Sequence, residues 1–204
     1  MLTAVHRRRG DDPLPAAVAL LRREGPAALT MRNVANEAGV TATALYRHYA
    51  DKDALLKAVV SAAYGEFRDW IMLPEAPANP ALALNLAFDR FLHFGVQHPN
   101  LYRLLFIENH GHGIDRYPDD FVSGKSVTFR RLKSVVEAWA IAESGQPASR
   151  EASADWTLSI YAHMHGMLTL YLAGRFPDKR EFEAFFHRSM NLLARGILDL
   201  AKHG

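Results

Sequence analysis

The 204-residue chain contains no cysteine. This absence excludes a disulfide framework, a zinc site built on thiolates and a cysteine nucleophile, and it is typical of a reducing compartment. The chain also shows no secretory signal, because the basic residues near its start are not followed by an apolar run. We therefore expect a protein that works in the cytoplasm.

Long uncharged stretches are also scarce, and only residues 156–174 (WTLSIYAHMHGMLTLYLAG) are long enough to raise the question of a membrane span. Two histidines, a serine and two threonines are spread along this stretch. Such side chains are costly in lipid and ordinary in a helix buried inside a protein. We therefore expect a buried helix here and no membrane partner.

Strand patterns are missing as well. No segment shows sustained alternation or a high density of β-branched residues, whereas helix-period patterns run through almost the whole chain. The sequence predicts an all-α fold of about nine helices, over residues 12–24, 30–38, 41–49, 51–71, 80–97, 100–109, 119–143, 150–174 and 179–202. Residues 74–80 (PEAPANP) are the best linker candidate. We expect an N-terminal domain over residues 1–57 and a C-terminal domain over residues 58–204.

Enzyme signatures are absent too: there is no glycine-rich phosphate loop after a strand, no GxSxG, no HExxH and no notable carboxylate pair. We expect neither an enzyme nor a cofactor.

The ten histidines raise the question of a metal site. Among them, His163 and His165 point about 200° apart on a helix and cannot share an ion. His110 and His112 could share one, but no third ligand stands at a recognisable spacing. We expect no metal site, and a metal-responsive protein remains an alternative.

Residues 30–53 do carry a recognisable pattern. Two short helices, each preceded by a threonine that can cap it, flank Gly39, which can adopt the left-handed conformation of a turn. This is the helix-turn-helix arrangement. On the second helix Leu45 and Tyr49 share an inward face, while Thr43 and Arg47 point outward.

The outward face of that second helix suits DNA. It is small at its start and larger further on, so the helix tip can approach base edges in a major groove. Arg47 can reach guanine or phosphate, and Tyr46 and His48 can donate to phosphate oxygens. Residues 1–60 also hold nine Lys/Arg against six Asp/Glu. The alternative is a helical hairpin whose polar face is merely solvated.

The segment LTMRNVANEAGVTATALYRHYADKDALL closely resembles the DNA-binding signature of the TetR family of bacterial transcriptional regulators, across residues 25–60. The resemblance implies operator contacts at Met31, Arg32, Ala42, Thr43, Ala44, Tyr46, Arg47, His48 and Lys52, with capping and phosphate contacts from Thr30 and Thr41. Thr43 stands where many members have glycine, which leaves the operator sequence open. Residues 6–9 (HRRR) resemble a basic arm that some members lay along DNA, and a solvated tail is the alternative.

The C-terminal half resembles a TetR subgroup with an HG motif in two stretches, HPNLYRLLF (98–106) and HMHGMLTLYLAGRFP (163–177). The resemblance implies an effector cavity beside a dimer face. The candidate pocket residues are the aromatic, aliphatic, methionine and histidine residues of the middle helices: Phe91, Phe94, Tyr102, Phe106, Trp139, Trp156, Ile160, His163, Met164 and Met167. For any single one of them, an ordinary core position is the more frequent role, because apolar and aromatic side chains mostly lie in the core. As a set they favour a small apolar or aromatic effector with one or two polar anchors.

A single short recognition helix cannot supply the affinity of a specific regulator, so we expect a two-fold homodimer that reads two half-sites on double-stranded DNA. The last two helices have the apolar surfaces that such a dimer would bury. The expected protein is a ligand-responsive regulator, a repressor that its effector releases from the operator. A helical dimerisation or scaffold protein with vestigial DNA binding is the alternative.

Overall fold

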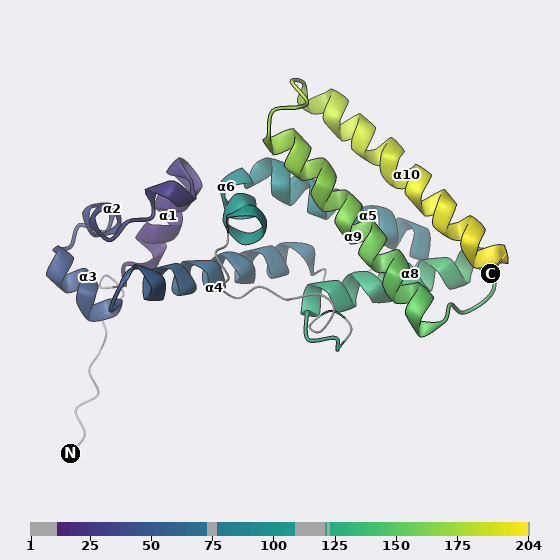
Figure 1. Cartoon of the computed structure of the whole chain (residues 1–204), viewed down its shortest axis with the longest axis horizontal. Helices are drawn as coiled ribbons and strands as arrows, with labels where there is room; N and C mark the ends of the chain where they lie inside the picture. The colour runs from purple at the N-terminus through teal and green to yellow at the C-terminus, as the bar shows by residue number, and fades with distance from the viewer. Residues whose placement is uncertain (1–11, 73–76, 109–120, 122, 204) are drawn as a thin grey trace, which may run out of the picture. The chain divides into compact units, whose positions relative to one another are not determined.

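The computed structural model describes residues 12–72, 77–108, 121 and 123–203, and every regular element within them is helical (Figure 1). The all-α prediction is therefore confirmed. The elements are α1 (Leu14–Glu24), the 3₁₀ turn η1 (Pro26–Ala28), α2 (Met31–Glu37), α3 (Ala42–His48), α4 (Lys52–Ile71), α5 (Pro80–Gln97), α6 (Pro99–Tyr102), the π-helical turn η2 (Arg103–Ile107), α8 (Val127–Ser144), α9 (Arg150–Leu172) and α10 (Lys179–His203).

The predicted helix bounds agree with most of these elements, and the helix predicted over residues 119–143 is the main error. Residues 109–120 and 122 lie outside the described part of the chain, and α8 begins only at Val127. Gly124, with a φ of +76°, lies in a turn just before α8. A left-handed residue cannot continue a right-handed helix, so a single helix from 119 to 143 is wrong.

The chain forms two compact units, residues 1–66 with 98–114 and residues 67–97 with 115–204. We call them the N-terminal unit and the C-terminal unit. The predicted boundary between residues 57 and 58 falls inside the continuous helix α4, and the chain returns to the N-terminal unit at α6. A functional division at residue 57 therefore remains a prediction.

The N-terminal unit is built on α1, α2, α3, the larger part of α4, and α6 with η2. Its buried core includes Leu20, Leu21, Leu29, Val34, Leu45, Leu55 and Val59. α6 packs against α1, and Asn100 Nδ2 donates to the carbonyl of Arg22 at 2.9 Å. These contacts join the two chain segments of the unit. They do not involve α3, which lies on the surface of the unit.

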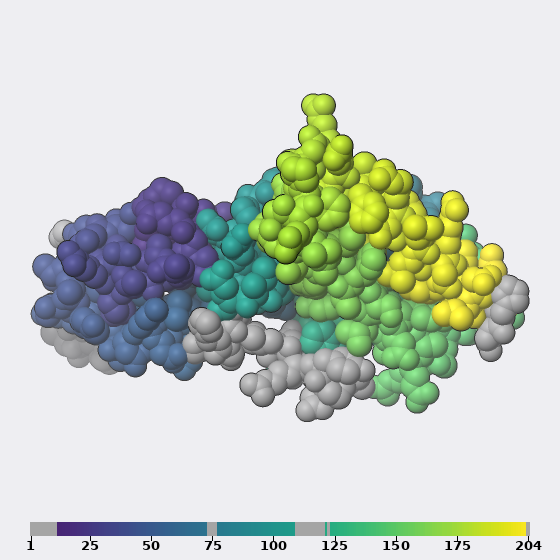
Figure 2. Space-filling model, turned by 45° about the horizontal axis from the view of Figure 1, so that its top comes forward, coloured from purple at the N-terminus to yellow at the C-terminus, as the bar shows by residue number. Residues whose placement is uncertain are grey.

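The C-terminal unit consists of α5, α8, α9 and α10, together with the last residues of α4. Its buried core includes Leu84, Phe88, Leu92, Val136, Ile160, Leu168, Phe182, Phe186 and Met190. α9 and α10 run side by side as a helical hairpin (Figure 1), and their side chains form much of one outer face of this unit (Figure 2). Among the described residues, no helix is long and apolar enough to span a bilayer.

Candidate nucleic-acid interface and ligand pocket

The predicted helix-turn-helix is present, with both threonine caps in place. Thr30 Oγ1 accepts a hydrogen bond from the backbone N–H of Asn33 at 3.1 Å, and Thr41 Oγ1 accepts one from Ala44 at 3.1 Å. Each bond satisfies one of the free N–H groups at the start of a helix. Gly39, with a φ of +65°, provides the left-handed turn between α2 and α3. Local interactions thus set the start of both helices and the bend between them.

The orientation of α3 follows the predicted helical wheel. Leu45 is fully buried, against a core that includes the buried Val34 and Ala35 of α2. The opposite face is open to solvent: Ala42, Thr43, Tyr46 and Arg47 are exposed, and Ala44 and His48 are half-buried. Tyr46 keeps 53% of its surface accessible, which is high for so large an aromatic side chain. The hydrophobic side of α3 therefore holds the helix, and its polar side is presented outward.

Three cations lie on α3 or close to it in the sequence. Within the part of the chain that the structure describes, Arg32, Arg47 and Lys52 form no ion pair with a carboxylate, and all three residues are exposed. The neighbouring Glu37 is engaged elsewhere, because Arg23 Nη2 donates to its carboxylate at 2.8 Å and holds the pKa of Glu37 below its usual value. The surface around α3 is therefore free to attract an anion such as a phosphate backbone.

The remaining predicted contact positions lie beside α3. Thr30 and Met31, at the start of α2, are half-buried, whereas Thr41 is exposed. Lys52 is the first residue of α4, where Asp51 Oδ1 accepts a hydrogen bond from the N–H of Ala54 at 2.8 Å and so caps the helix. The arm at residues 6–9 lies outside the described residues. All the described candidates belong to one unit, and their contact with DNA remains a prediction.

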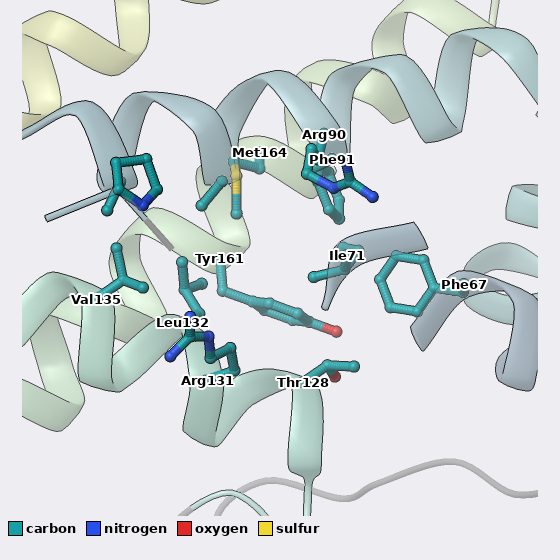
Figure 3. A pocket seen from close by; sticks show the side chains of 13 residues that line it. Phe67, Ile71, Arg90, Phe91, Thr128, Arg131, Leu132, Val135, Tyr161 and Met164 are labelled. Carbon is teal, nitrogen blue, oxygen red and sulfur yellow. The ribbon is translucent and has the colours of Figure 1, made fainter. Parts of the chain in front are cut away.

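The C-terminal unit contains a pocket between the end of α4 and helices α5, α8 and α9 (Figure 3). Its cavity volume is about 50 Å³. Its thirteen lining residues are Phe67, Ile71, Pro77, Ala83, Ala87, Arg90, Phe91, Thr128, Arg131, Leu132, Val135, Tyr161 and Met164. The pocket is mainly apolar with a few polar groups, which is the usual make-up of a small-molecule site.

Two of the ten predicted effector residues, Phe91 and Met164, line this pocket. The other eight do not line it. Phe94 packs on Phe67 with 4.9 Å between ring centroids, Tyr102 and Phe106 pair at 5.0 Å in the N-terminal unit, and Ile160 and Met167 are core residues. Trp139 lines a second hollow between α5, α8 and α10, Trp156 is half-buried, and His163 Nε2 lies 2.7 Å from Ser189 Oγ. Most of these positions therefore have the ordinary core role that the sequence also allowed.

The pocket residues that were not predicted include its polar groups, Arg90, Thr128, Arg131 and Tyr161. The predicted set was made of aromatic, aliphatic, methionine and histidine residues, and it contained no arginine. The sequence does contain a pattern that indicates part of this wall, because residues 128, 131, 132 and 135 of α8 have the spacing of one helix face. That face combines two polar residues with two apolar ones, as the wall of a binding site often does.

His165 lies beside the pocket. Its ring contacts two residues of the pocket wall, Phe91 at 4.7 Å and Tyr161 at 4.2 Å between ring centroids. Burial lowers the pKa of His165 to about 3, because the charged imidazolium would lose its hydration. The described residues contain no group of three side chains that could hold a metal ion, and His110 and His112 lie outside them.

Comparison with known proteins agrees with this geometry. The model of bacterial regulatory proteins of the tetR family matches residues 14–59, and the model of the tetracyclin repressor-like C-terminal domain matches residues 84–193. No curated protein sequence gives a significant match. The first match covers the helix-turn-helix, and the second covers more than half of the chain.

Solved structures share the fold at low identity. A protein of unknown function from Rhodococcus sp. RHA1 is 21% identical, with a TM-score of 0.72, over 96% of this chain and 98% of that chain. Mycobacterium smegmatis BioQ is 23% identical, with a TM-score of 0.60, over 95% and 98%. A variant of TetR from Acinetobacter baumannii AYE, in complex with minocycline, is 19% identical, with a TM-score of 0.62, over 93% and 96%.

The two family matches, the capped helix-turn-helix and the shared all-α fold lead to one assignment. This family consists of DNA-binding transcriptional regulators and not of enzymes. The chain belongs to the TetR family of bacterial regulatory proteins.

Proposed function

We propose that the protein is a cytoplasmic, homodimeric repressor that binds operator DNA through α3 and releases it when a small apolar or aromatic effector enters the pocket. Residues 1–57 would bind DNA, and residues 58–204 would bind the effector and form the dimer. The observation that carries the proposal is the outward face of α3, where Thr43, Tyr46 and Arg47 are exposed while Leu45 is buried.

The side chains on the outward face of α3 are suited to different contacts with DNA. Residues 42–44 (ATA) at its start are small enough for close approach to base edges, and a threonine or alanine methyl suits the methyl group of thymine. Arg47, one turn later, has the length and the planar donors to reach a guanine or a phosphate. Arg32 and Lys52 lie outside α3 and are suited to backbone phosphates, which fix the register of a protein on the duplex.

The proposed dimer rests on α9 and α10, which expose apolar side chains. Leu192 keeps 70% of its surface accessible and Leu200 keeps 65%, and Phe185 of α10 and Leu170 of α9 are exposed as well. Gly166 is exposed on α9, and a side chain added there would meet nothing within 4 Å, so a second helix could approach it closely. Two such hairpins packed together would form a four-helix bundle that buries these residues.

The proposed effector response depends on α4. Phe67 and Ile71, near its end, line the pocket, and Lys52 is its first residue. The open space has room for only a few water molecules, so an effector has to displace part of the wall. An effector that favours a conformation with α4 moved would shift the population away from the state that fits two half-sites about 34 Å apart.

The proposal is tested by fluorescence anisotropy with the purified protein, its own upstream intergenic DNA and a scrambled duplex, at two salt concentrations. A sequence-specific repressor binds the native DNA more tightly than the scrambled one, and its affinity falls as salt rises. Equal weak binding to both duplexes would contradict the proposal for this DNA and favour a scaffold role. Release of the complex only by a metal ion would favour a metal-responsive regulator.

A further inference from the structure

The charged residues described in the pocket wall are all positive. Of the thirteen lining residues, two are arginines, Arg90 and Arg131, and none is an aspartate or glutamate. Figure 3 shows the two arginines entering from α5 and α8, on opposite sides of the Tyr161 ring. A mainly apolar pocket whose charged lining groups, among the described residues, are both cations favours a ligand that carries a negative charge on an apolar body.

Arg90 already has a structural role. Its Nε donates to the carbonyl of Trp70, while Trp70 Nε1 donates to the carbonyl of Arg90 at 3.0 Å. The guanidinium also lies 5.9 Å from the centroid of the Trp70 ring, within range of a cation–π contact. These contacts tie α5 to the end of α4 and hold Arg90 in place, so it contributes fixed positive charge more than a mobile anchor.

Arg131 differs from Arg90 in its contacts. Its side chain is half-buried, and within residues 12–72, 77–108, 121 and 123–203 its guanidinium makes neither a hydrogen bond nor an ion pair. Thr128 precedes it by one turn on the same face of α8, and Leu132 and Val135 continue that face. α8 therefore presents a polar end and an apolar end to one pocket.

We propose that this pocket binds an apolar monocarboxylate, with its carboxylate on the Arg131 guanidinium and its hydrocarbon body against Leu132, Val135 and Met164. The planar guanidinium can donate two parallel hydrogen bonds to a carboxylate, which a neutral ligand cannot match. This inference rests on the proposed function, because it names the chemical class of the effector for the same pocket. The competing interpretation is that Arg131 packs its stem on the pocket rim and keeps its charge in water.

The test compares two matched pairs of probes by isothermal titration calorimetry on the full chain: octanoate with 1-octanol, and 2-naphthoate with 2-naphthylmethanol. We expect at least one carboxylate to bind about tenfold or more tightly than its alcohol, the effect of a charge-assisted bond in a partly buried site. Arg131→Met should abolish this preference, and Arg131→Lys should retain part of it. Arg175→Met removes an exposed arginine outside the pocket, and this control should keep the full preference.

Equal affinity for carboxylate and alcohol in both pairs would overturn the inference, as would a preference that survives in Arg131→Met. Absence of binding by both carboxylates would overturn it too. Thermal melts of the variants confirm that each one is folded. Release of operator DNA is measured separately, so a carboxylate that binds through Arg131 without releasing DNA would contradict the proposed response and leave the anion site standing.

Discussion

Arg47 and Lys52 are both exposed cations of the N-terminal unit, but the proposed complex uses them differently. Arg47 lies on the face of α3 that would enter the major groove, whereas Lys52 begins α4 and would meet phosphate. Arg47→Ala should weaken operator binding by about 1–3 kcal/mol and relax the preference at one base pair. Lys52→Ala should weaken binding to all sequences alike and reduce the salt slope by about one.

Anisotropy titrations of both variants against the operator and its single-base variants check this prediction. A specificity change in Lys52→Ala, or none in Arg47→Ala, would reverse the two roles. Unchanged affinity in both variants would remove these residues from the interface altogether.

His165 makes a separate prediction about pH. Its folded-state pKa is about 3 against an ordinary value of 6.5, so between these values the unfolded chain binds a proton that the folded chain does not. The contribution of His165 to stability is therefore complete above pH 6.5 and is lost as the pH falls through this window, by at most about 1.4 kcal/mol per pH unit. His165→Phe should remove this part of the slope while keeping a ring against Phe91 and Tyr161.

Urea unfolding of the original protein and of His165→Phe at about pH 7, 6 and 5 provides the measurement. The difference in unfolding free energy between the two proteins should shift in favour of the variant as the pH falls. A constant difference across the three pH values would show that His165 keeps its usual pKa in the fold.

Among the helices, α5 and α9 approach each other closely at Gly95. A Cβ atom added there would lie 2.6 Å from Leu168 Cδ1 and 2.8 Å from Cδ2, and Leu168 is fully buried and has little room to move. Gly95→Ala should therefore lower the unfolding free energy by about 1–2 kcal/mol, because the overpacking cost exceeds the gain in helix propensity. Gly65 of α4 is the matched control, because a Cβ there meets nothing within 4 Å.

Gly65→Ala should raise stability by up to about 1 kcal/mol through helix propensity alone. Chemical denaturation of both variants against the original protein measures the two effects. If Gly95→Ala were as stable as Gly65→Ala, α5 and α9 would have to separate at this point without cost, in conflict with the close approach at Gly95.

Prediction from the sequence succeeded where the controlling interactions are local. The Thr30 and Thr41 caps and the Gly39 turn involve bonds within a few residues, so the pattern alone determines them. The start of α8 was predicted too early, because the sequence does not reveal that Gly124 adopts a left-handed conformation in a turn before this helix. The pocket wall was largely missed because it is assembled from four helices, and one sequence does not reveal which of their faces meet.

For the whole molecule, DNA affinity should depend on the dimer. Leu192 is 70% exposed on the face of α10 that we assign to the interface, and a glutamate there would have to lose its hydration beside apolar neighbours. Leu192→Glu should therefore convert the dimer to monomers, seen as a halved mass in sedimentation or light scattering. Its affinity for a two-half-site operator should fall by about 100-fold or more, because a monomer reads only one half-site.

Leu82→Glu supplies the control, since Leu82 is 58% exposed but lies on α5, outside the proposed interface. This variant should keep both the dimer mass and the operator affinity. If Leu192→Glu stayed dimeric, the two copies would have to meet through another surface. If it became monomeric yet bound the operator as tightly as before, recognition would reside in a single helix-turn-helix, and the link between subunit spacing and effector response would no longer hold.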